Sequence, residues 1–126
     1  SDQHAVVDML EEARALEMHE RLATGERGRF APDELMGALT RAGHFSLGWP
    51  EAGRIEVGAP CDLVAVRLDT PRTAGVDPTQ VVFAATNADV DTVVVGGRAV
   101  VQAGRHLLGD IGRLLSGAID AIWSGR

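Results

Sequence analysis

Two valine-rich runs flank a pair of glycines in the stretch DTVVVGGRAVVQAG, residues 91–104. β-Branched residues favour extended strands. A Gly-Gly pair can adopt the positive φ angles that a two-residue hairpin turn requires. The stretch therefore predicts a β-hairpin with its turn at Gly96 and Gly97. Because an isolated hairpin is marginal in water, we expect further strands beside it and a second layer of structure against it.

A second strand-rich region, GRIEVGAPCDLVAVRLD, covers residues 53–69. Ile55 and Val57 alternate with polar residues, which predicts one short strand there. The apolar run 63–66 predicts another, separated from the first by a Gly-Ala-Pro turn. Together with the hairpin, these segments predict a small sheet of four short strands.

A helix is predicted over residues 2–22, because apolar side chains recur there at helical spacing. Its N-cap would be Asp2. The stripe along this helix consists of Val6, Leu10, Ala13 and Leu16.

Three further helices are predicted later in the chain, over residues 31–43, 75–85 and 111–123. Pro32 suits the first helical position, and Gly43 can close the same helix. Asp77 and Pro78 are typical of a helix start. Because helical and strand segments are partly segregated along the chain, the fold class is α+β.

Composition narrows the classes of function. The chain has 126 residues, enough for one ordinary domain, and a formal net charge of −6. An acidic protein without a basic stripe is a poor binder of nucleic acid or of an anionic membrane surface. No apolar run approaches the roughly 20 residues of a membrane span. The single cysteine, Cys61, excludes an internal disulfide and suits a reducing compartment, so we expect a cytoplasmic protein.

The residues alone show no complete active site. The histidines lack the two- or four-residue spacing of a local metal site. Cys61 follows a proline at a predicted strand start and is interpreted as a buried, small apolar residue. Glu11, Glu12 and Arg14 are interpreted as a solvated helix face. The four histidines are His4, His19, His44 and His106, of which His19 and His106 are interpreted as solvated or capping residues.

Two of these stretches resemble conserved segments of the amidohydrolase superfamily. GRIEVGAPCDLVAVRLD is similar to the segment G-x-I-x-x-G-x-x-A-D-L-V, with Cys61 where alanine is usual. VDTVVVGGRAVVQAGRH is similar to the closing segment V-x-x-V-x-V-x-G-x-x-V-x-x-x-G-R. The resemblance implies a C-terminal fragment of a metal-dependent (β/α)8-barrel hydrolase. Residues 1–50 would be the last barrel helix and the helices that follow, 51–109 the C-terminal share of a composite β-sandwich, and 110–126 a terminal helix.

Longer stretches are most similar to formimidoylglutamate deiminases, among them SDQHAVVDMLEEARALEMHERL and VVFAATNADVDTVVVGGRAVV. These enzymes hydrolyse N-formimidoyl-L-glutamate to N-formyl-L-glutamate and ammonia in histidine catabolism. The alternatives are another deaminase or hydrolase of the superfamily, such as a guanine deaminase or a chlorohydrolase-like enzyme. A non-catalytic, protein-binding module is an alternative of a different class.

The start of the chain resembles the Ser-Asp-Ser-His segment of these deiminases, with Gln3 in place of the second serine. The resemblance implies that Asp2 contacts a divalent metal, zinc in most members, and transfers protons during attack by the metal-activated water. It also implies that His4 contacts substrate or water.

Most of the metal ligands would lie outside this chain, since a catalytic zinc needs about three protein ligands. The chain alone is therefore expected to be inactive. Its expected partners are a small-molecule substrate, the remaining barrel portion and a second subunit in a homodimer.

Overall fold

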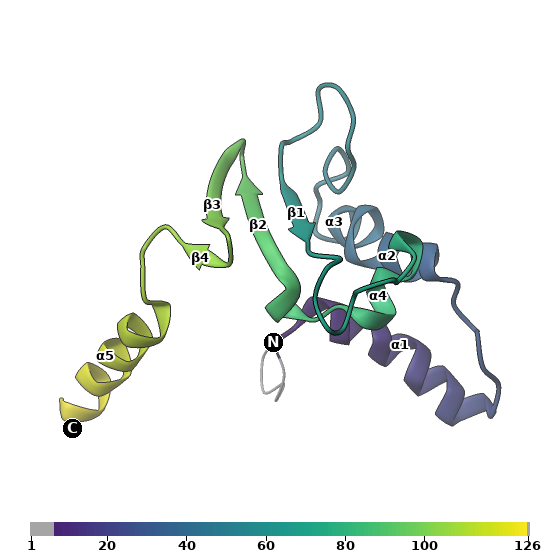
Figure 1. Ribbon diagram of the computed structural model, residues 1–126, viewed down its shortest axis with the longest axis horizontal. Coiled ribbons are helices and arrows are strands. Elements are labelled where there is room, and N and C mark those ends of the chain that lie inside the picture. Colours follow the sequence, from purple (N-terminus) through teal and green to yellow (C-terminus); the bar gives the residue numbers. More distant parts are fainter. Residues whose placement is uncertain (1–6, 126) are drawn as a thin grey trace.

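The computed structural model describes residues 7–125, which form a group of helices and a small antiparallel sheet (Figure 1). The strands are β1 (Leu63–Val66), β2 (Val90–Val95), β3 (Arg98–Gln102) and β4 (Arg105–His106). The α-helices are α1 (Met9–Thr24), α2 (Pro32–Leu39), α3 (Arg41–Ser46), α4 (Val81–Ala84) and α5 (Ile111–Ser124). Two 3₁₀ helices, η1 (Pro78–Gln80) and η2 (Asn87–Asp89), flank α4. The α+β class predicted from the sequence is confirmed.

The predicted hairpin is confirmed as strands β2 and β3, joined at Gly96 and Gly97 with φ angles of 55° and 79°. The strand order is β1-β2-β3-β4, with each neighbouring pair antiparallel. The residues just before β1 hold the turn: Gly97 N–H donates to the Cys61 carbonyl at 2.9 Å, and Gly96 N–H donates to Asp62 Oδ1 at 2.6 Å.

The prediction of a strand around Ile55 and Val57 is wrong. These two side chains are 90% and 103% exposed, and the segment has no strand neighbour among residues 7–125. An alternating pattern forms a strand only where another strand supplies hydrogen bonds. The fourth strand is β4 instead, which pairs with β3 through Val101 and His106.

The first helix begins at Met9, so the prediction of a continuous helix from residue 2 is wrong. Asp8 is extended, with φ −146° and ψ 108°, and is the N-cap of α1. The predicted start contained two aspartates that suit an N-cap, and the β-branched pair Val6–Val7 between them is a weak helix former. The predicted cap Asp2 lies outside the described residues.

The predicted helix over 31–43 is two helices, α2 and α3, which meet at Thr40. The Thr40 hydroxyl donates to the Met36 carbonyl at 2.7 Å, which occupies an acceptor at the end of α2. The loop at Gly53 passes so close that a Cβ there would lie 2.6 Å from the Thr40 carbonyl carbon. Gly43 therefore lies inside α3, and the chain bends at Thr40. The predicted helix over 75–85 is narrower, as η1 followed by α4, with Asp77 as its cap.

A small core joins α1, α2 and α4. Its buried members are Ala13, Leu35 and Val82. Leu10, Phe30, Met36 and Leu39 pack against them. Two members of the predicted stripe, Leu10 and Ala13, thus face their own chain.

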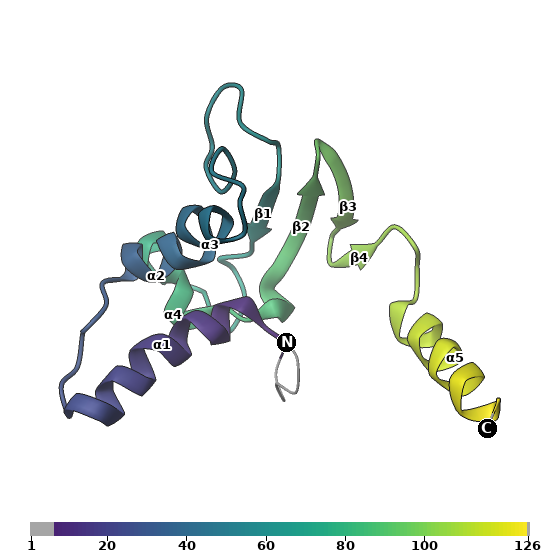
Figure 2. The ribbon, with the colours of Figure 1, turned by 180° about the vertical axis from the view of Figure 1, so that it is seen from behind.

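The C-terminal helix α5 lies apart from the other helices, on the far side of the sheet in both views (Figures 1 and 2). Its large apolar side chains stay exposed, namely Leu114, Leu115, Ile119, Ile122 and Trp123. Among the described residues, no helix is both long and apolar enough to cross a membrane.

Candidate functional site

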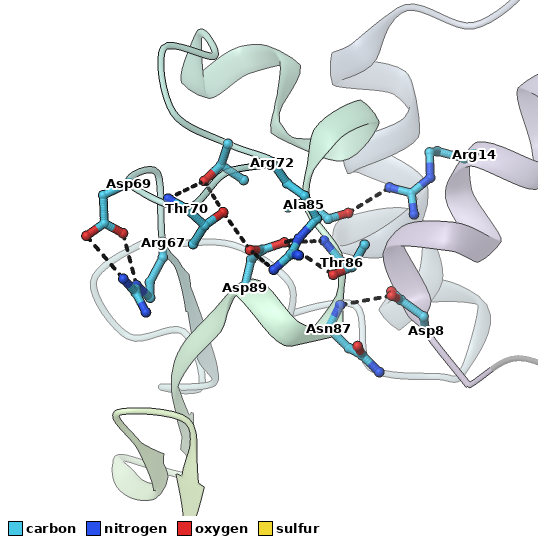
Figure 3. A network of polar contacts seen from close by, with 11 residues as sticks. Asp8, Arg14, Arg67, Asp69, Thr70, Arg72, Ala85, Thr86, Asn87 and Asp89 are labelled. Atoms are coloured by element: carbon cyan, nitrogen blue, oxygen red, sulfur yellow. Dashed lines mark hydrogen bonds and ion pairs between the residues drawn. The ribbon is translucent and has the colours of Figure 1, made fainter.

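The two residues that the resemblance assigns to the site, Asp2 and His4, lie outside the described residues. The described structure that follows them along the chain is the start of α1, with its attachments to the rest of the chain (Figure 3).

Asp8 joins the start of α1 to the segment that leads into β2. Its Oδ1 accepts from Leu10 N–H at 2.9 Å and from Glu11 N–H at 3.4 Å, which caps the helix. Its Oδ2 accepts from Asn87 N–H at 2.9 Å. Asp8 is buried, with 8% of its surface exposed. One carboxylate thus connects two segments that are far apart in the sequence.

Arg14 makes a second attachment on the same side of α1. Its Nη1 donates to the Val82 carbonyl at 2.8 Å and to the Ala85 carbonyl at 2.7 Å. These carbonyls belong to α4 and its C-cap, where backbone acceptors lack helical partners. The prediction that Arg14 is solvated is wrong, because a guanidinium can satisfy two such acceptors at once. Glu11, one turn before Arg14 on the helix, is exposed as predicted.

A fully buried carboxylate, Asp89, fixes the next part of this segment. Arg72 donates from Nε to Oδ2 and from Nη2 to Oδ1, both at 2.8 Å. Thr86 N–H donates to Oδ2 at 2.9 Å and the Thr70 hydroxyl donates to Oδ1 at 2.8 Å. The hydrogen bonds from Arg72 are the main reason that the pKa of Asp89 is held well below its ordinary value, against the effect of burial.

Glu17 is a second fully buried carboxylate, and it fixes the loop between α1 and α2. It accepts from Arg21 Nε at 2.7 Å, from Gly28 N–H at 2.7 Å and from Phe30 N–H at 2.9 Å. The Arg21 hydrogen bond, with those from Phe30 and Gly28, lowers the pKa of Glu17 to about 2. The carboxylate is therefore ionised throughout the physiological range and anchors the loop.

These polar groups are connectors rather than reactive groups. Every buried side-chain nitrogen and oxygen atom in the described part of the chain has a hydrogen-bond partner. Within residues 7–125, no three histidine, cysteine, aspartate or glutamate side chains gather into a group that could hold a metal ion. This part of the chain therefore does not by itself provide the metal site that the resemblance implies.

The remaining candidate residues lie apart from this network. Cys61 is exposed, so the prediction that it is buried is wrong for this chain. It precedes β1, which within residues 7–125 has a neighbouring strand on one side only, and its backbone carbonyl accepts from the hairpin turn. His19 is exposed, and His106 Nδ1 accepts from Leu108 N–H at 3.1 Å, which agrees with the predicted solvated and capping roles.

Sequence reasoning missed Asp8, Arg72 and Asp89. A local signal existed for Asp8, since an aspartate directly before a helical pattern is a typical N-cap. The sequence Thr86-x-x-Asp89 likewise has the spacing of a capping box. No local signal reveals that Arg72 reaches Asp89, because that contact depends on how two distant segments pack.

Comparison with known proteins shows the family to which the chain belongs. The sequence model of the amidohydrolase family matches residues 1–100, and the chain belongs to this family. The resemblance seen in the sequence is thereby confirmed.

Two curated relatives show the range within the family. A 5-methylthioadenosine/S-adenosylhomocysteine deaminase of Pelotomaculum thermopropionicum is 31% identical over 98 residues, covering 76% of this chain and 23% of the relative. A formimidoylglutamate deiminase of Pseudomonas aeruginosa is 32% identical over 117 residues, covering 84% of this chain and 26% of the relative. The chain spans about a quarter of the length of these relatives.

Solved structures agree with this class. The zinc complex of the atrazine chlorohydrolase TrzN from Arthrobacter aurescens TC1 matches with a TM-score of 0.75 and 28% identity, over 88% of this chain and 25% of that one. A zinc-bound adenosine deaminase from Xanthomonas campestris matches with a TM-score of 0.80 and 23% identity. That match covers 89% of this chain and 26% of the deaminase. Because the identity is only 23%, the likeness to the adenosine deaminase concerns the fold alone.

Proposed function

We propose that this chain is the C-terminal part of a metal-dependent hydrolase that acts on non-peptide C–N bonds, and that it works together with a (β/α)8-barrel portion. The reaction proposed is deimination of N-formimidoyl-L-glutamate to N-formyl-L-glutamate and ammonia, in histidine catabolism. The metal, zinc, would supply an activated water, and it would be bound chiefly by side chains outside residues 7–125.

The main support for this substrate is the extent of the match to the Pseudomonas aeruginosa formimidoylglutamate deiminase. That alignment covers 84% of the chain, compared with 76% for the deaminase of Pelotomaculum thermopropionicum, at nearly equal identity. The longer similarity agrees with the resemblance carried by the first 22 residues.

The proposed reaction places a defined demand on Asp2. Water adds to the formimidoyl carbon, the bond from that carbon to the terminal nitrogen breaks, and a formyl C=O bond forms. The imino nitrogen departs as ammonia only after it gains two protons. A carboxylate can deliver both in turn, the first taken from the attacking water as it adds and the second from the new hydroxyl group as the C=O bond forms. Asp2 is the proposed carboxylate, and His4 is proposed to contact substrate or water.

A second candidate is deamination of a purine nucleoside. It is favoured by the 5-methylthioadenosine/S-adenosylhomocysteine deaminases, one of which, from Natronomonas pharaonis, is 34% identical over 98 residues. A chlorohydrolase-like activity has the likeness to TrzN in its favour. Both candidates are hydrolytic displacements at an unsaturated carbon, so they would use the same kind of site.

The test is a substrate panel on the natural protein that contains this chain, with ammonia release measured for N-formimidoyl-L-glutamate, 5-methylthioadenosine and S-adenosylhomocysteine. A site built to bind the substrate's polar groups discriminates by about 10⁴-fold against compounds lacking them. We therefore expect kcat/KM for N-formimidoyl-L-glutamate to exceed the other two by at least about 10²-fold. Preference for either nucleoside would replace the proposed substrate with the second candidate.

A further inference from the structure

We draw no further inference here: the strongest candidate, the exposed apolar face of the C-terminal helix α5 formed by Leu114, Leu115, Ile119, Ile122 and Trp123, carries none because nothing in the described part of the structure shows what covers it.

Discussion

Single buried carboxylates hold together segments that apolar packing alone would leave loose. In the described part of the chain, the core of α1, α2 and α4 has three fully buried apolar members. Beside it, Glu17 and Asp89 are each almost completely inaccessible, and each accepts from an arginine and from backbone N–H groups. Breaking a buried charge pair by removing one partner is strongly destabilising. Arg21, four positions after Glu17 on α1, is a partner that the local sequence indicates. The contacts of Glu17 with Gly28 and Phe30, and of Asp89 with Arg72, were not predictable, because they depend on how separate segments pack.

The hydrogen bonds of Glu17 predict how the stability of its loop depends on pH. The pKa of Glu17 is lowered from 4.5 to about 2, so its contribution to stability is complete above pH 4.5 and is lost as the pH falls toward 2. In Glu17→Gln, one of the two backbone N–H groups loses its acceptor. We expect hydrogen-exchange protection of the Gly28 and Phe30 amides to be lower in the variant at pH 7, and the difference to shrink below pH 4.5.

The control for this experiment is Glu26→Gln in the same loop, whose carboxylate is exposed and pairs with Arg29 at 3.1 Å. It should leave both amides as protected as before. A difference between Glu17→Gln and the unsubstituted protein that stayed constant from pH 7 to pH 3 would contradict the assigned role.

At the scale of elements, the sequence predicts what depends on neighbours in the chain. The hairpin of β2 and β3 and the helix α5 were predictable, because glycine conformation and helical periodicity are local properties. The absence of a strand at Ile55 and the exact start of α1 were not predictable. The first depends on a partner strand, and the second on a choice between two aspartates, in which the contact of Asp8 with Asn87 takes part. The assignment of a site to Asp2 and His4 stays a prediction from the resemblance, and the attachments of Asp8 could not be predicted because they depend on packing.

The hairpin turn provides a second prediction. Gly96 has φ 55°, and the space where a Cβ would lie is open within 4 Å. Strain, rather than a clash with neighbours, therefore decides the cost of substitution. Valine in this left-handed conformation costs about 1–2 kcal/mol, whereas asparagine tolerates it. Gly96→Val should lower the free energy of unfolding by that amount relative to Gly96→Asn, as measured by urea denaturation. Equal stabilities would show that the turn can adopt another conformation.

At the scale of the whole molecule, the chain is organised as a helical group and a sheet with outward-facing apolar surfaces. Leu16, Met18 and Leu22 on α1 are exposed, as are the large apolar side chains of α5. Exposed apolar surface of this extent is typical of interaction sites. The amidohydrolase relatives are about four times longer than the region that they share with this chain.

The central claim is that this chain serves a metal-dependent C–N hydrolase, and its most direct test is ammonia release from N-formimidoyl-L-glutamate before and after metal removal. For the natural protein we predict turnover that a chelator abolishes and that added zinc restores. For residues 1–126 prepared alone we predict no turnover with or without zinc. Turnover by the natural protein that survives complete metal removal, or robust zinc-dependent ammonia release by residues 1–126 alone, would contradict the account.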